Sequence, residues 1–186
     1  MSAREKKTKR LSREDWLHEA LLDLAADGVP KTIDYLVDKL GVTKGSFYHH
    51  FTDREDFIVS LANFWDEEYT RNIADTVLDL SKAPKDNLWR LMREIDERGL
   101  GALDLPMRNL ALQNTNVAAV VTRVDRYRLA QLRRLFAAMG FKDEALEART
   151  YSFVTQFSLS AGIYAQVPKS RRKKHLKALH SFYTRP

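Results

Sequence analysis

The sequence contains no cysteine, which excludes a disulfide framework, a thiolate metal site and a cysteine nucleophile. Only seven glycines and five prolines interrupt its 186 residues, and there is no alternating strand pattern and no internal repeat. No apolar run approaches the roughly 18–20 residues that cross a bilayer, and the N-terminal residues lack the apolar segment of a signal peptide. We therefore expect an all-α, soluble, cytoplasmic protein with no membrane partner.

Catalytic motifs are missing as well. The chain has no Gly-Lys-Ser/Thr phosphate loop, no Gly-x-Ser-x-Gly elbow and no Gly-x-Gly-x-x-Gly run. None of its five histidines forms a His-x-x-x-His or Glu-x-x-His pair suited to a metal. We predict that the protein is not an enzyme, has no catalytic residues, and holds no metal and no cofactor.

The charge is basic overall but unevenly distributed. The chain carries a formal charge of +6, with a net +4 in residues 1–10, +7 in residues 169–186 and −5 between them. A basic total is typical of nucleic-acid-binding proteins, and we expect the N-terminal arm to supply most of the attraction to phosphate. The C-terminal run is interpreted as a solvated helix face; a second contact with DNA or an anionic surface is the alternative.

Apolar periodicity and capping residues predict about nine helices. Ser12 caps the first, which ends before Gly28, and Thr32 caps the second, which Gly41 closes. Thr43 caps a short third helix. Longer helices are predicted near 53–80, 86–98, 104–114, 116–139, 143–166 and 170–183. This arrangement indicates an arm and three-helix domain over residues 1–52 and a larger helical domain over residues 53–186.

Residues 41–51, Gly-Val-Thr-Lys-Gly-Ser-Phe-Tyr-His-His-Phe, are the most informative segment. Thr43 is a good N-cap, and Val42 before it can pack on Phe47 as a hydrophobic staple. Phe47 and Phe51 lie four residues apart and therefore share the inward face. A short helix held on a second helix by a tight turn is typical of proteins that insert side chains into the DNA major groove.

The remaining side chains of this helix are predicted to face away from the core. Lys44, Tyr48 and His49 point outward, and Gly45 leaves the first turn bare, so that the helix N-terminus can approach a phosphate. An ordinary solvated helix, in which Tyr-His-His is accidental, is the alternative interpretation.

From about Arg13 to Leu61 the chain resembles the DNA-binding domain of the TetR/AcrR family of bacterial transcriptional regulators. The most specific parts are the run at 40–51 and the basic Arg54, at a position where the family usually has a phosphate-binding lysine. Two departures, Ala25 and the stretch 37–40, affect packing and leave the presumed DNA face unchanged. The resemblance implies a helix-turn-helix domain, a C-terminal domain with an internal cavity, and a homodimer.

The resemblance also implies roles in binding double-stranded operator DNA. We expect Lys44 to donate to guanine, His49 or Ser46 to reach a neighbouring base edge, and Gly45 to allow close approach. The expected phosphate contacts are Thr32, Thr43, Tyr48, His50 and Arg54.

A small, apolar effector is the second implied partner, bound in a cavity beside the helix at 53–80. Aromatic and methionine side chains suit an adaptable apolar pocket. The candidate lining residues are Trp65, Tyr69, Trp89, Met92, Met107, Leu110, Phe136, Phe153 and Phe157. The alternative is that these side chains simply pack against one another as core.

Small residues about one turn apart mark the predicted helix at 143–166. In the family the last two helices of each subunit form the dimer interface, and a glycine inside a helix indicates close packing. The residues assigned to this interface are Ser158, Ala161, Gly162 and Ala165. A cavity wall or an intrachain contact is the alternative.

These patterns together predict a ligand-responsive dimeric transcriptional regulator, by default a repressor, that binds a pseudo-palindromic operator. The alternative is a helical ligand-binding or adaptor protein whose DNA face is idle.

Overall fold

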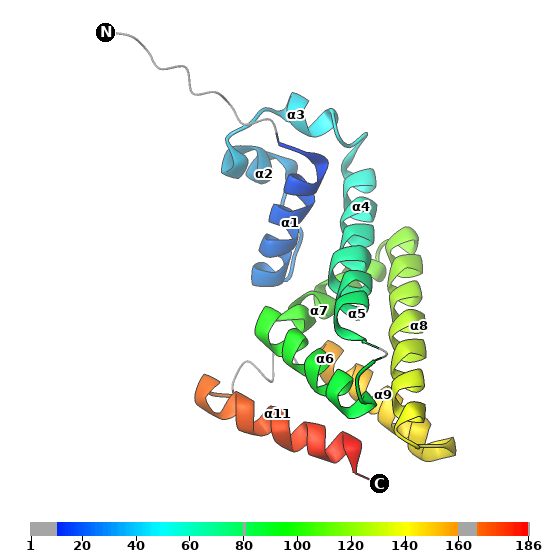
Figure 1. Cartoon of the computed structure of the whole chain (residues 1–186). Coiled ribbons are helices and arrows are strands. Elements are labelled where there is room, and N and C mark those ends of the chain that lie inside the picture. Colours follow the sequence, from blue (N-terminus) through cyan, green and yellow to red (C-terminus); the bar gives the residue numbers. More distant parts are fainter. Residues whose placement is uncertain (1–10, 80, 160–166, 186) are drawn as a thin grey trace. The chain divides into compact units, whose positions relative to one another are not determined.

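The structure is a computed structural model that describes residues 11–79, 81–159 and 167–185 (Figure 1). Within these ranges the chain forms helices and turns, and no strand occurs. This confirms the all-α prediction. The contacts divide the chain into two compact units, Met1–Leu61 and Ala62–Pro186, and each is described by itself. The division falls inside α4 (Arg54–Asp66), nine residues after the predicted boundary at 52/53.

The first unit begins with three helices whose ends follow the predicted caps. They are α1 (Arg13–Asp27), α2 (Ile33–Leu40) and α3 (Lys44–Tyr48). Ser12 and Asp15 form a capping box at the start of α1, with hydrogen bonds of 2.8 and 3.1 Å between side chains and backbone amides. Gly28 ends α1 at a φ of 75°, in the left-handed region that favours glycine.

An aromatic cluster forms the core of this unit. The ring of Phe47 on α3 lies 5.6 Å from that of Trp16 on α1, 5.1 Å from Phe51 and 5.3 Å from Phe57 on α4. Each of these four side chains is at most 1% exposed. Edge-on contacts between buried rings add to the free energy of burying their apolar surface. Phe47 therefore anchors α3, a helix too short to be stable by itself.

The second unit contains the C-terminal part of α4 and the remaining helices. Their bounds are a π-helical turn Glu67–Arg71, α5 (Asn72–Val77), α6 (Pro84–Arg98), a 3₁₀ turn Leu100–Leu103, α7 (Asp104–Ala111), α8 (Thr115–Ala138), α9 (Asp143–Leu159) and α11 (Lys169–Thr184). The helix predicted over 53–80 is thus three consecutive segments. It ends at Leu78, whose backbone is extended.

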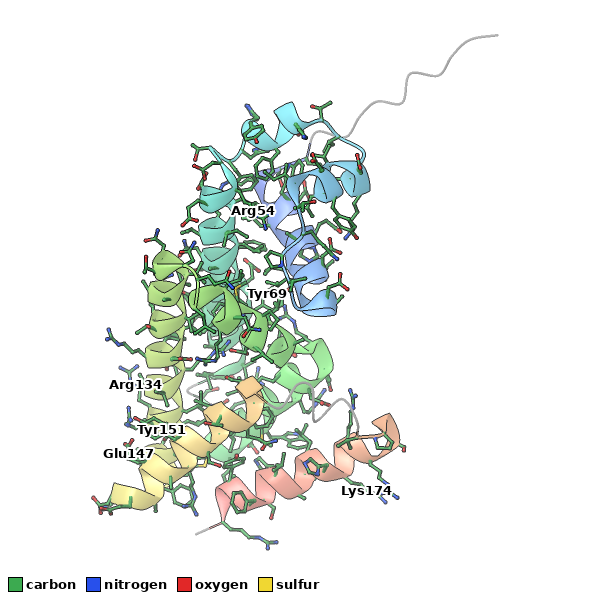
Figure 2. All side chains as sticks on the ribbon, turned by 180° about the vertical axis from the view of Figure 1, so that it is seen from behind. Arg54, Tyr69, Arg134, Glu147, Tyr151 and Lys174 are labelled. Atoms are coloured by element: carbon green, nitrogen blue, oxygen red, sulfur yellow. The ribbon has the colours of Figure 1, made fainter. Side chains whose placement is uncertain are left out.

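Helices α6, α8, α9 and α11 share an apolar core, and Figure 1 shows α11 lying alongside α6. Phe136 of α8 is fully buried, and its ring centroid lies 6.2 Å from that of Phe153 on α9 and 6.1 Å from that of Tyr183 on α11. Arg171, Lys173, Lys174 and Lys177 of α11 are exposed, and Figure 2 shows Lys174 pointing away from this core. None of the helices within the described ranges has the length and apolar character to cross a membrane.

Phe47→Ala tests whether the aromatic cluster holds α3 in place. Removing a fully buried ring should lower the free energy of unfolding of the first unit by about 3–5 kcal/mol. The neighbouring Tyr48→Ala is the matched control: its ring centroid lies 5.3 Å from that of Phe47, but the residue is 55% exposed, so its loss should cost only about 1 kcal/mol. Urea unfolding, with amide hydrogen exchange to locate the effect in residues 13–61, measures both. Equal losses for the two variants would show that α3 is held by something other than Phe47.

Candidate nucleic-acid interface and ligand cavity

The turn between α2 and α3 is built by three residues. Gly41 has a φ of 64°, and its N–H donates to the carbonyl of Asp38 at 3.2 Å. The N–H of Val42 donates to the carbonyl of Val37 at 3.1 Å. The Thr43 hydroxyl then accepts from the N–H of Ser46 at 3.3 Å and starts α3. The left-handed glycine lets the chain reverse within one residue, so α3 begins four residues after α2 ends.

Helix α3 buries one side chain and presents the others to solvent. Phe47 is fully buried, whereas Lys44, Gly45, Tyr48 and His49 are exposed. This confirms the predicted division of the helix into an inward and an outward face. Thr43 is also exposed, while Ser46 and His50 are partly buried. The specific DNA roles assigned to these residues stay predictions.

Lys44 forms an ion pair with Asp34 of α2, with 2.6 Å between its Nζ and Oδ1. The hydrogen bond to Asp34 and the charge of that carboxylate raise the pKa of Lys44 above its ordinary value. The two side chains are 61% and 67% exposed, so solvent screens the pair and it contributes little to stability. The ion pair instead places a carboxylate beside Lys44, the cation that is expected to contact a base.

Three other predicted phosphate contacts make bonds inside the unit. The Nε2 of His50 lies 3.0 Å from the carbonyl oxygen of Leu11, so this nitrogen carries the proton and donates. Arg54 donates to the carbonyl of Lys31 at 3.1 Å. The Thr32 hydroxyl accepts from the N–H of Tyr35 at 3.2 Å as the cap of α2. A capping hydroxyl keeps its own O–H and can still donate it to a phosphate.

The charge of this unit is acidic. Residues 11–61 contain five lysines and arginines against ten aspartates and glutamates. Lys31 is paired with Asp27 at 2.7 Å. Lys39 is paired with Asp23, also at 2.7 Å. Residues 11–61 therefore carry a net charge of −5, and the net positive charge of the chain lies in residues 1–10 and 169–186.

The second unit contains a cavity with about 620 Å³ of space between its atoms, part of it open to solvent. Tyr69 and Thr70 enter its wall from the π-helical turn, and Figure 2 labels Tyr69 there. Helices α5 to α9 supply the rest of the wall, which is mostly apolar. A concave, mainly apolar space with a few polar groups is the usual form of a small-molecule site.

The polar groups of the cavity are joined by Arg128 of α8. Its Nη1 donates to Asp104 of α7 and, at 3.3 Å, to the hydroxyl of Ser158 on α9. Its Nη2 donates to the Thr70 hydroxyl at 3.0 Å. The guanidinium also lies 5.3 Å from the ring centroid of Trp65, within the range of a cation–π interaction. One arginine thus connects the π-helical turn, α7 and α9 to α8.

Asp104 is 2% exposed, and this burial raises the pKa of its carboxyl above the ordinary value. The nearby charge of Arg128 opposes that shift without cancelling it. Burial disfavours the charged form of a carboxyl, whereas a guanidinium stays protonated.

Sequence reasoning identified only part of the cavity wall. Three predicted residues, Tyr69, Phe153 and Phe157, do line it. The other six do not line this cavity, and their assignment as ligand contacts stays a prediction: Trp65, Trp89, Met92, Met107, Leu110 and Phe136. Four of these six are fully buried among other side chains. The reason is rotational: a stripe of aromatic residues does not show which side of its helix faces a space.

Asp104 and Arg128 were missed, although the sequence contains a signal for one of them. Val124 and Leu132 of α8 are buried, and Arg128 lies midway between them at helical spacing. A cation that interrupts an apolar stripe indicates a buried charge that needs a partner.

The residues predicted at a dimer interface have different outcomes. Ser158 is buried, and its hydroxyl lies in the cavity wall beside Arg128. This is the alternative placement, a cavity wall and intrachain contact. Ala161, Gly162 and Ala165 lie outside the described residues, and their assignment stays a prediction.

Comparison with known proteins gives a distant similarity to a regulator. No family model matches the chain. Over 68 residues the chain is 35% identical to the transcriptional regulator AcuR of Cereibacter sphaeroides, a match that covers 37% of this chain and 31% of the relative. The matched segment thus spans about a third of the relative's length. The protein is an all-helical chain distantly similar to a transcriptional regulator, and that relative's name describes no enzyme.

Arg128→Met tests the buried ion pair. Leaving Asp104 buried without its partner should cost about 3–5 kcal/mol of unfolding free energy. Because the folded-state pKa of Asp104 is raised, its contribution to the free energy of unfolding is fully present at low pH. That contribution is lost as the pH rises through the raised pKa. The loss in the variant should therefore be larger at pH 8 than at pH 5.

Urea unfolding at the two pH values measures this difference. In the double variant Arg128→Met with Asp104→Asn the buried carboxyl is gone, so the pH-dependent part should disappear. A loss of the same size at both pH values in the single variant would contradict the assignment of a raised Asp104 pKa.

Proposed function

We propose that this protein is a ligand-responsive, homodimeric transcriptional regulator of the TetR type that binds a pseudo-palindromic operator. The observation that carries the proposal is the α2–Gly41–α3 arrangement. It anchors a short helix through Phe47 and leaves Lys44, Tyr48 and His49 exposed together. The distant similarity to a transcriptional regulator supports it independently.

The DNA-reading part of the proposal assigns α3 to the major groove. Lys44 lies in the first turn of α3, where a recognition helix contacts base edges, and its ammonium donates to guanine O6 or N7. When DNA binds, the Lys44 ammonium leaves the Asp34 carboxylate and donates to the base instead. His49 or Ser46 reaches a neighbouring base, and Thr32, Thr43, Tyr48, His50 and Arg54 position the backbone.

The charge distribution supports separate roles for the N-terminal arm and for α3 in DNA binding. The helices of the first unit are acidic overall, so they repel phosphate at long range. Residues 1–10, with a net charge of +4, supply the compensating attraction. Selectivity then comes from α3 and long-range attraction from the arm.

Dimerisation sets the geometry of the operator. A two-fold dimer presents two copies of α3, which should read half-sites about 34–36 Å apart or at a multiple of that spacing. The resemblance to the TetR/AcrR family predicts that the contact between copies involves Ala161, Gly162 and Ala165.

The effector part of the proposal assigns the ligand to the cavity of the second unit. Tyr69 and Thr70 of its wall belong to the π-helical turn that directly follows α4 in the chain. π-Helical turns are rare and often occur at functional sites. A ligand that binds one arrangement of this turn more tightly shifts the conformational equilibrium by its differential affinity. For a repressor, this shift releases the protein from DNA.

A second candidate function is a helical adaptor whose DNA face is idle. The acidic character of residues 11–61 and the pairing of Lys44 with Asp34 favour it. Such a protein would show no sequence-selective binding at any salt concentration, whereas a regulator selects a defined site.

Lys44→Ala tests the reading role on a site obtained by selection from a random duplex library. The selected sequence should be a pseudo-palindrome. The variant should bind it about tenfold or more weakly, because a specific lysine–guanine contact is lost. Affinity for random DNA should fall much less. Fluorescence anisotropy at moderate salt measures both, with the exposed Lys142→Ala of the second unit as control.

Equal weakening on selected and random DNA would make Lys44 a phosphate contact and remove its reading role. Failure to select any site would overturn the regulator proposal in favour of the adaptor.

Asp34→Asn tests the competition for Lys44. Removing the carboxylate frees the ammonium and removes a repulsion with phosphate, so affinity for DNA should rise about three- to tenfold. Asp38→Asn, on the same helix but not ion-paired with Lys44, is the matched control and should have a smaller effect. Anisotropy titrations over a salt series measure the change. Weaker binding by Asp34→Asn would mean that the ion pair positions Lys44 for DNA.

A further inference from the structure

The feature that the proposed function leaves unused is a permanent cation in the wall of an apolar cavity. Arg128 shares this wall with ten apolar residues from α5, α6, α8, α9 and the turns beside them, among them Ile73, Leu91, Ile95, Leu132 and Phe153. Its side chain is 18% exposed. Placing a guanidinium in such surroundings is costly unless a partner compensates it, so its place in the cavity needs a reason.

The contacts of Arg128 leave part of its hydrogen-bonding capacity unused. A guanidinium carries five N–H groups. Asp104, Ser158 and Thr70 accept from three of them. No bond to a described residue is recorded for the other two, on Nη2 and Nε, so they are available to a further acceptor in the cavity.

The Asp104–Arg128 pair can change its net charge in one direction only. The guanidinium does not lose its proton at any physiological pH. Asp104 can gain one, because burial favours its neutral form. The pair is therefore neutral or carries +1, and it never becomes negative. The charge of such a site therefore favours an anion over a cation.

The other titratable groups near Asp104 do not change this result. Arg108 and Asp125 act on it electrostatically, and they bind each other through two hydrogen bonds of 2.7 and 2.9 Å. Their charges cancel within that pair. Tyr69 and Tyr127 also line the wall, and burial raises the pKa of both, so they stay neutral and can donate an O–H to an anion.

We propose that this cavity binds an apolar monocarboxylate, with the carboxylate on Arg128 and the hydrocarbon part among the surrounding aliphatic and phenylalanine side chains. When the ligand binds, Asp104 takes one proton from solvent, and the ligand carboxylate replaces it as the anion that accepts from the Arg128 guanidinium. Charge then balances, because the ligand anion replaces the Asp104 anion. The inference rests on the proposed function only where it identifies this ligand as the effector.

Calorimetry with three matched probes tests the ligand class on the full wild-type chain. The probes are octanoate, octan-1-ol and octylamine, which share a chain and differ in charge. Octanoate should bind about tenfold or more tightly than octanol, since a charge-assisted hydrogen bond is stronger than a neutral one, and octylamine should bind most weakly. Titration at pH 7 in phosphate and in Tris, whose ionisation heats differ, should show uptake of about one proton per octanoate.

Two variants separate the roles of the pair. Asp104→Asn, which mimics the protonated carboxyl, should bind octanoate at least as tightly as wild type and take up no proton. Arg128→Met should lose the preference for octanoate over octanol. If it unfolds, the double variant with Asp104→Asn replaces it. Arg134→Met, an exposed residue of the same helix labelled in Figure 2, is the control and should change nothing.

Equal binding of octanoate and octanol by wild type, a preference for octylamine, or binding of none of the three probes would overturn the inference. So would octanoate binding without proton uptake. A failure here alongside selective DNA binding leaves the proposed regulator intact. Octanoate binding by a protein that selects no DNA site overturns the regulator and leaves the ligand site standing.

Discussion

The hydrogen bonds of one partly buried guanidinium join α8 to three other elements of the cavity wall. Arg128 contacts α7 through Asp104, α9 through Ser158 and the π-helical turn through Thr70. Without a counter-charge this cation could not stay in an apolar wall, and without the cation Asp104 would be buried alone. The same bonds that fix the shape of the cavity therefore determine its charge. A ligand that competes for Arg128 must also change the contacts of the turn that follows α4.

The first unit depends on a different constraint, the burial of Phe47. A five-residue helix has too few internal hydrogen bonds to persist unless it is packed. Since the ring of Phe47 lies against the buried rings of Trp16, Phe51 and Phe57, Lys44 and Tyr48 can be exposed while α3 stays packed. The surroundings of this exposed face are acidic, since residues 11–61 contain five lysines and arginines against ten aspartates and glutamates.

Much of the secondary structure could be read from local signals. Ser12, Thr32 and Thr43 are N-caps as predicted, and Gly28 and Gly41 end helices in the left-handed conformation. These signals act over three or four residues, so sequence spacing is sufficient. The helix predicted over 53–80 was too regular, since no glycine or proline marks the π-helical turn at Glu67–Arg71. Of the nine residues predicted around a cavity, Tyr69, Phe153 and Phe157 line the one in the second unit, since a sequence pattern does not show how each helix is rotated.

By itself the sequence determined the helical class, the capped ends of the N-terminal helices and the outward face of α3, because each depends on neighbours within a turn or two of the same chain. Tertiary structure alone decided which aromatic residues surround the cavity and that Arg128 meets Asp104. It also decided that Lys44 rests on Asp34, ten residues earlier in the chain. These pairings join side chains from different helices, and the relative rotation of packed helices is set by the whole core rather than by any local pattern.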